Sequence, residues 1–398
     1  MSDHEVRASR PSRPVIGAVV ATVPIVVATV RALARGWTPL GDNGLLLLRT
    51  QDVLTSNHPL LGTWTSASLS AGRNINNPGP LWFDLLAPFE KVAGPSVGFA
   101  VGVMAANVGA VVLAAWAAQR VGGETASAVV SALSAGLAWS MGSELLFDAW
   151  QPHSMLLPCW ALLILAWCVA HGDLAVAPWL LGVASLLVQT HLSYTYLVPL
   201  LVGGALVTGV VVHRRGDGST RPLRPRRAVV LATVVVVLAW VQPLIDQVAG
   251  RGNLGRLLAA GDSQGPRLGA GIGVRLVAAV VGLPPWWTRP GFSGTVETLT
   301  SSNGPDGPVL PPVDLPGRVP AVAGMVLVLA LIVAAFVVGR QRTDTRLRAA
   351  GVVAALGVAG ALISTTLIPV GIGISPHQMR WLWPMSAFVT LILVLTVV

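Results

Sequence analysis

Long apolar segments separated by shorter polar connections occupy the chain from residue 14 to its end. Apolar runs of about 20 residues are long enough, as α-helices, to cross ~30 Å of hydrocarbon. The pattern predicts an all-α fold, a polytopic transmembrane helical bundle of about ten spans, preceded by a cytoplasmic tail at 1–13. The expected spans are 14–30, 96–118, 125–141, 153–170, 174–190, 194–212, 228–248, 319–338, 347–369 and 381–398.

Two polar stretches, 36–95 and 250–318, are too long to be simple turns between spans. They are the first and fourth outward loops of a single membrane domain at 14–398. Within the second stretch, 274–283 is apolar and is predicted to lie in the membrane interface. Residues 304–320 are rich in proline and glycine and predict an irregular loop. Because the chain ends inside an apolar run, we also expect that the protein continues beyond it.

Composition supports a membrane protein and excludes a nucleic-acid-binding one. Hydrophobic residues make up 53% of the chain and charged residues only 11%, whereas soluble domains have about 25% charged residues. The net charge of +9 comes almost entirely from arginine, since Lys91 is the only lysine. The arginines lie in connections between spans and form no basic patch with interleaved aromatic residues, so we expect no nucleic-acid partner.

Arginine-rich connections predict the orientation. The 213–227 connection holds six arginines against Asp217, and the 340–348 connection holds four against Asp344. With ten spans, both connections and the basic tail fall on one side, which the positive-inside rule assigns to the cytoplasm. We therefore expect a multi-pass protein of the plasma membrane, with a cytoplasmic N-terminus and the long polar loops outside.

Acidic residues on the outward side are candidates for catalysis. Asp42 follows the first span in Gly41-Asp42-Asn43-Gly44, and an ionisable residue at a membrane boundary is costly unless it is used. The same four residues are also good turn formers, which is an equal alternative. Glu144 and Asp148 are spaced i, i+4 and would share one face of a helical turn. A solvated loop explains them equally well.

Further outward polar residues are candidates for substrate binding. Gln189 and His191 interrupt an apolar region, and His377 and Arg380 precede the last span. Outward arginines have the geometry to clamp a phosphate, although snorkelling at the membrane surface explains each one alone. Asp84 is expected to pair with Arg73 or to be a simple interfacial group. The full set of binding candidates is Arg49, His58, Arg73, Asn77, His153, Gln189, His191, His377 and Arg380.

Several sequence motifs are absent. The chain has no phosphate-binding loop, dinucleotide fingerprint, HExxH, CxxC or nucleophile elbow. Cys159 and Cys168 are predicted to be small buried hydrophobic residues. Nucleotide-driven chemistry is therefore not expected. A transferase acting outside the cytoplasm would need an activated donor that is already attached to lipid.

The sequence resembles a group of actinobacterial multi-pass proteins of the GT-C superfamily, glycosyltransferases that use polyprenyl-phosphate sugars. The resemblance covers most of the chain and is most specific in the first outward loop. It rests on Gly41-Asp42, Arg49…Asp52, His58-Pro59-Leu60-Leu61-Gly62, Asn77-Pro78-Gly79-Pro80-Leu81, Gln151-Pro152-His153 and Val188-Gln189-Thr190-His191. Two positions depart from the pattern: Asn43 stands where a second acid often follows, and Asn77 where histidine often precedes Pro-Gly-Pro.

The resemblance implies an inverting transfer of a sugar from a polyprenyl-phosphate donor to a glycan or glycolipid acceptor of the cell envelope, within the lipid membrane. Asp42 would then be the base that deprotonates the acceptor, and Asp148 or Glu144 the second acid. The leaving phosphate would be stabilised by Arg73, Arg380 or His191. A divalent metal is compatible with this chemistry but not required, and no other cofactor is expected.

Two alternatives remain from the sequence. A transporter or flippase of a lipid-linked substrate predicts polar residues in the middle of spans, and Asn107 is the main example here. A non-catalytic membrane protein of envelope assembly would keep the fold without the chemistry.

Overall fold

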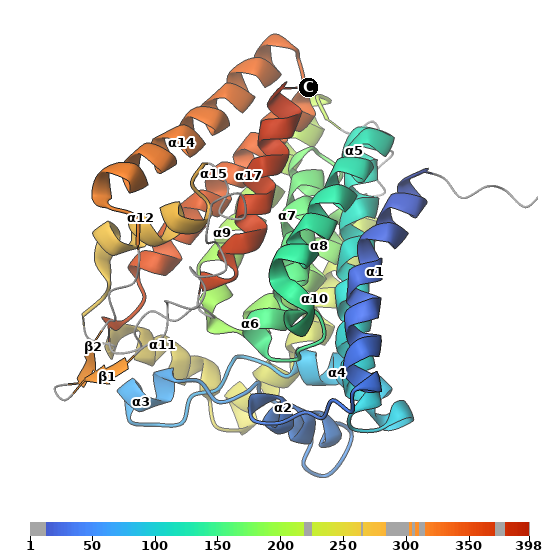
Figure 1. Cartoon of the computed structure of the whole chain (residues 1–398), viewed down its shortest axis with the longest axis vertical. Helices are drawn as coiled ribbons and strands as arrows, with labels where there is room; N and C mark the ends of the chain where they lie inside the picture. The colour runs from blue at the N-terminus through green and yellow to red at the C-terminus, as the bar shows by residue number, and fades with distance from the viewer. Residues whose placement is uncertain are drawn as a thin grey trace, which may run out of the picture.

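The computed structural model describes residues 13–218, 225–263, 266–283, 302–304, 307–309, 315–370 and 379–397. Long helices stand side by side, and several short helices gather at one end of them, at the bottom of Figure 1. We call this the loop-rich end. The start of α1 (Arg13–Ala34) and the turn between α14 (Arg318–Gln341) and α15 (Thr345–Thr366) lie at the opposite, arginine-rich end.

Seven helices among the described residues are long and apolar enough to cross a membrane, which indicates a membrane-embedded protein. Each expected apolar segment coincides with a helix. Two of them fall within α5, which changes direction at Gly123, where the backbone leaves helical geometry (φ 69°, ψ −155°). Helix α5 spans Val97–Leu145. The other expected segments correspond to α1, α14 and α15, and to α7 (Leu156–Ala170), α8 (Ala177–Thr190), α9 (Leu197–Arg215), α10 (Pro225–Ala249) and α17 (Leu382–Val397).

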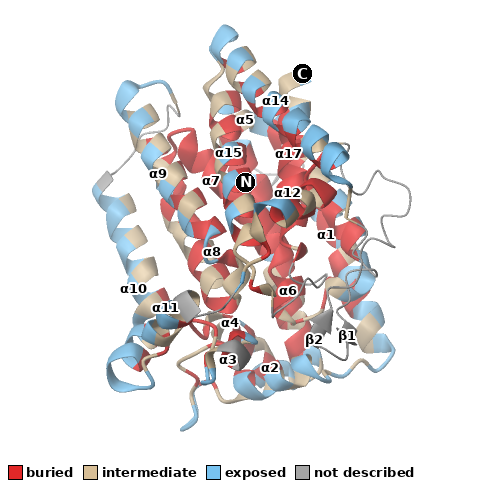
Figure 2. Ribbon diagram, turned by 90° about the vertical axis from the view of Figure 1, so that its left-hand side faces the viewer, coloured by how far each residue is buried: buried red, intermediate tan, exposed pale blue. Residues whose placement is uncertain are grey.

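Helix α7 is the centre of the bundle, and all of its residues are buried. It packs against α5, α8, α9, α15 and α17, whereas α9, α10 and α14 show long exposed stretches in Figure 2. Close approach depends on small residues: a Cβ added at Gly209 of α9 would collide with the Val169 carbonyl oxygen of α7. Such contacts are typical of helices that associate within lipid. The exposed valines and leucines of α10 and α14 are suited to face hydrocarbon.

The two long polar stretches, 36–95 and 250–318, contain more regular structure than the sequence indicated. The first contains α2 (Asp42–Gln51), α3 (Ala67–Ala71) and α4 (Leu81–Ala93), and the second contains α11 (Asn253–Ser263) and α12 (Gly269–Val280). Helix α12 packs against α14 and α15 with Leu276 and Val277 buried, and its location in the membrane interface stays a prediction. A two-stranded antiparallel hairpin, β1 (Ser302–Gly304) and β2 (Gly307–Val309), replaces part of the predicted irregular loop.

The arginine-rich end is joined by an ion pair. Arg120, near the middle of α5, contacts Asp173, which precedes a 3₁₀ turn (Leu174–Val176), with N–O distances of 2.6 and 2.8 Å. The two side chains are 19% and 3% exposed, and the guanidinium lies 5.0 Å from the ring centre of Trp116. Nearby, the Asp344 carboxylate accepts from two backbone N–H groups and caps α15.

Candidate functional site

Asp148 lies in the connection between α5 and the short helix α6 (Gln151–Ser154), at the loop-rich end. This connection is fastened on both sides of the acid. The Asn107 side chain donates to the Leu146 carbonyl at 2.9 Å, and the Trp82 indole donates to the Ala149 carbonyl at 3.0 Å. Asn107 therefore supports this connection, which weakens its use as a sign of a transport pathway. Asp148 is held rigidly although it lies outside a helix.

Three donors point at the Asp148 carboxylate. The Asn43 amide, brought in by the first turn of α2, donates to Oδ1 at 2.6 Å. The Trp150 backbone N–H donates to the same oxygen at 3.1 Å, and the His153 Nδ1 is hydrogen-bonded to Oδ2. The carboxylate is 19% exposed. It is thus a partly buried acid fully engaged by neighbours from two distant parts of the chain.

These contacts keep Asp148 ionised. Burial is the largest single influence and acts to raise its pKa. The hydrogen bonds and charge of His153, together with the Trp150 N–H and the Asn43 amide, outweigh it and lower the pKa below its ordinary value. At neutral pH the site therefore contains a fixed negative charge.

His153 lies in α6, where Pro152 stands in the first turn, and its side chain is 10% exposed. Because the Asp148 carboxylate can only accept, the His153 Nδ1 must donate, which leaves Nε2 as an acceptor in the neutral ring. That Nε2 is buried and has no hydrogen-bond partner among the described residues. The ring also packs edge-on against Trp150, with ring centres 4.8 Å apart.

Arg380 provides positive charge beside this pair. It precedes α17 and is only partly exposed, and its charge acts on both Asp148 and His153. Burial lowers the pKa of Arg380 while Asp148 raises it, and an arginine remains charged at neutral pH in either case. Within the described part of the chain, its buried Nε and one terminal nitrogen, Nη1, have no acceptor. These donors are suited to an anionic oxygen.

Buried amide groups extend the site. Gln151 and Asn77 both donate to the Thr63 hydroxyl, at 2.6 and 2.8 Å. Gln189 donates to the Ala239 carbonyl of α10 at 2.6 Å. In the described residues, the amide oxygens of Asn43, Asn77 and Gln189 receive no hydrogen bond. Acceptors of this kind are suited to hydroxyl groups.

The Pro-Gly-Pro segment is pressed against α8 by Gly79. Its N–H donates to the Gln189 backbone carbonyl at 3.3 Å. A Cβ at this position would collide with the Gln189 amide and would lie 2.7 Å from the Pro243 ring. Glycine is therefore required for the Pro-Gly-Pro segment to contact α8 and α10 together.

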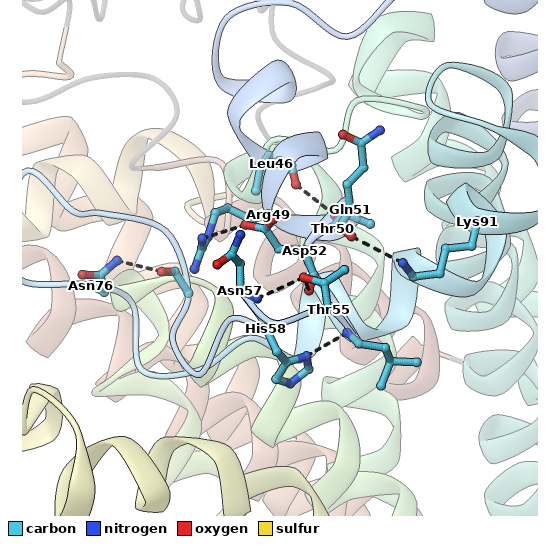
Figure 3. Close-up of polar contacts among 12 residues, drawn as sticks. Leu46, Arg49, Thr50, Gln51, Asp52, Thr55, Asn57, His58, Asn76 and Lys91 are labelled. Carbon is cyan, nitrogen blue, oxygen red and sulfur yellow. Dashed lines mark hydrogen bonds and ion pairs between the residues drawn. The ribbon is translucent and has the colours of Figure 1, made fainter.

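His58 belongs to a separate hydrogen-bond network that links Leu54, Gln242 and Asp84. The Leu54 N–H donates to the His58 Nδ1 at 3.0 Å, a contact drawn in Figure 3. The ring must therefore carry its proton on Nε2, which donates to Gln242 at 3.0 Å. Gln242 in turn donates to Asp84 at 2.7 Å. Burial raises the pKa of Asp84, partly offset by Gln242 and His58.

The pairing of Asp84 with Arg73 was wrong, since Asp84 bonds to Gln242. Exposed Arg73 instead donates to the Arg256 carbonyl at 3.3 Å. The shared helical face expected for Glu144 and Asp148 was also wrong. Helix α5 ends at Leu145, so Glu144 stays exposed while Asp148 turns inward.

The other predicted residues are dispersed. Asp42 is exposed at the start of α2 and forms no side-chain hydrogen bond or ion pair within the described residues. Arg49 forms an exposed ion pair with Asp52 at 2.9 Å (Figure 3). His191 accepts from the Ser193 N–H at 3.3 Å and caps a 3₁₀ turn. His377 lies outside the described residues.

The structure thus brings together Asp148, His153 and Arg380 from the sequence prediction. It adds three polar residues that the prediction missed: Asn43, Thr63 and Gln242. Asn43 had a weak sequence signal, since it is a polar amide at the edge of an apolar segment, whereas Gln242 is an amide inside the expected 228–248 span.

In the described ranges, no group of three or more histidine, cysteine, aspartate or glutamate side chains is arranged to hold a metal ion. No family model matches this chain, and no curated protein or solved structure shows significant similarity to it. Function must therefore be argued from the site itself.

Proposed function

We propose that this protein is a membrane glycosyltransferase that moves a sugar from a polyprenyl-phosphate donor to a cell-envelope acceptor. One observation carries the proposal. An ionised, rigidly held Asp148, a buried histidine nitrogen and an arginine with unused donors lie together at one end of an apolar helical bundle.

The unused groups match the parts of such a substrate. Arg380 would bind the phosphate and stabilise the charge that develops as it leaves the sugar. The free amide oxygens of Asn77 and Gln189 would accept hydrogen bonds from hydroxyl groups. Exposed apolar faces of the surrounding helices would allow a polyprenyl chain to remain in lipid while its head group enters the site.

The same proposal places the site outside the cytoplasm. Arginines cluster at the end of the bundle opposite Asp148, and the positive-inside rule favours a cytoplasmic location for that end. A lipid-borne donor suits this location, because it does not depend on nucleotides. Asp148 precedes α6 and Arg380 precedes α17, so neither lies in the middle of a helix, which favours transfer over transport.

Sugar transfer from polyprenyl-phosphate donors to extracted envelope acceptors, measured with purified protein in lipid vesicles, tests the proposal. We expect D148N to lose at least ~10²-fold in rate. The matched acid-to-amide change E124Q, in an exposed residue at the other end of the bundle, should have no effect. Product formed equally by D148N and wild type would contradict the proposal.

The same assay compares Asp148 with Asp42, the base implied by the family resemblance. The exposed position of Asp42 predicts that D42N retains far more activity than D148N. The opposite order would return the catalytic role to Asp42.

A further inference from the structure

We propose that His153 is the proton acceptor of this site and that Asp148 is a positioning residue that acts through it. This inference rests on the proposed sugar transfer and goes beyond it, because the family resemblance assigns the base to an aspartate.

The first support is the direction of the hydrogen bonds. All three contacts to Asp148 are donated to it, and one of them comes from the His153 Nδ1. Two of these bonds are accepted by Oδ1 and one by Oδ2, which leaves the carboxylate about one free acceptor site and makes it a weaker base. The His153 Nε2, by contrast, carries an unused lone pair in the neutral ring.

The second support is the fixed position of the ring. His153 lies on a buried helical turn and packs against Trp150. The connection that carries Asp148 is tied to the bundle by Asn107 and Trp82. A carboxylate that holds Nδ1 in this way selects the tautomer with a free Nε2 and stabilises the imidazolium that forms.

The third support is the charge around the ring. Asp148, Glu144 and Arg380 are the charged groups that act on His153. Of these, Asp148 is in contact and Glu144 is exposed. Arg380 adds a cation that acts on the ring, and its unused donors are available for phosphate.

The proposed step is a direct displacement at the anomeric carbon of the donor sugar. The acceptor hydroxyl oxygen attacks the anomeric carbon and forms the new glycosidic bond. The bond between that carbon and the phosphate oxygen breaks, and its electron pair leaves with the polyprenyl phosphate near Arg380. The hydroxyl proton passes to the His153 Nε2, and the imidazolium later releases it to water. Asp148 stays ionised throughout.

The tautomer can be measured without any activity. In ¹⁵N-histidine-labelled protein in lipid, solid-state NMR at neutral pH should show His153 protonated on Nδ1 and not on Nε2. The signal is assigned by its loss in H153Q. In D148N the introduced amide can donate to Nδ1, so the proton should move to Nε2. A wild-type His153 protonated on Nε2 would overturn the inference.

Kinetics provide the second readout. H153Q should lower kcat by roughly 10²–10⁴-fold with little change in the donor KM, and D148N should do the same. The acid limb of the kcat/KM profile, which reports the base of the free enzyme, should disappear in H153Q. H213Q, in the last turn of α9 at the other end, is the matched control.

The two readouts separate the possible failures. Transfer by wild type that persists in H153Q with an unchanged pH profile would overturn the role of His153 and leave sugar transfer intact. An inactive wild type would overturn sugar transfer, while the tautomer would still decide whether Asp148 holds His153 as a base.

Discussion

Asp148 and Asp173 are two poorly exposed acids at opposite ends of the same bundle, and their partners differ. Asp173 is held by two nitrogens of Arg120, which also stacks on Trp116. Asp148 is held by an amide, a backbone N–H and a histidine, while the nearby Arg380 keeps unused donors. In the Arg120–Asp173 pair the two charges neutralise each other. Around Asp148, the His153 Nε2 remains as an acceptor and the Arg380 nitrogens remain as donors for a ligand.

This difference gives a criterion for telling a structural ion pair from a candidate ligand-binding site. Burial alone does not separate them, because Asp173 is the less exposed of the two acids. The useful criterion is whether the groups around the acid are left with hydrogen bonds to make. An unpaired buried polar group costs about 1–3 kcal/mol, so its retention beside Asp148 favours a ligand-binding role.

Among the changes that test this comparison of Asp148 with Asp173, the largest effect should come from removing the unused cation, Arg380. R380L is expected to lower the transfer rate by about 10²–10³-fold, the typical cost of losing one donor to developing negative charge. Thermal unfolding should change little, because the Nε and Nη1 donors make no hydrogen bond within the described residues. R380K retains the positive charge but lacks the planar guanidinium group, so its transfer rate should lie between those of R380L and wild type. Loss of stability with full activity would reverse the comparison.

The next largest effect should be a loss of stability when the Arg120–Asp173 ion pair is broken. R120L leaves the buried Asp173 carboxylate without its partner and should destabilise the fold by about 3 kcal/mol. The transfer rate per folded molecule should be unchanged. Replacing both residues, as in R120M/D173L, should recover much of the loss. Thermal or denaturant unfolding in detergent measures all three variants. Equal stability of R120L and wild type would contradict a structural role.

The smallest effect is a pH dependence of stability from Asp148. Its pKa in the folded protein lies below the ordinary value of 3.8. Ionised Asp148 therefore contributes stability above that value, and the contribution is lost as pH falls through the folded-state pKa. Wild type should exceed D148N in unfolding temperature at neutral pH, and the gap should narrow below about pH 4. A constant gap from pH 7 to pH 3 would contradict this.

The helical bundle could be predicted because periodicity and length are local properties. Each apolar run became a helix, and the turn expected near Arg120 corresponds to the break at Gly123. The short paired strands at 302–304 and 307–309 were missed because their residues are mostly turn formers without alternating hydrophobicity.

The site could be predicted only as a collection of residues. Asp148, His153 and Arg380 were identified as outward polar residues, but their mutual contacts depend on how distant helix ends meet. Asn43 and Asp148 are 105 positions apart, and no local pattern links them. The sequence favoured Asp42 over Asn43 as a site residue, because a charged side chain at a membrane boundary is costlier than an amide. The first turn of α2 places the amide inward and the charge outward.

The hydrogen bonds that fix the backbone around Asp148 should lower the entropic cost of binding a ligand. Asn107 and Trp82 hold its flanking carbonyls from within the bundle, so this backbone retains little conformational entropy that a ligand would need to remove. The free energy of recognition is then not spent on ordering the residue that positions His153. It remains available for orienting the two substrates relative to each other.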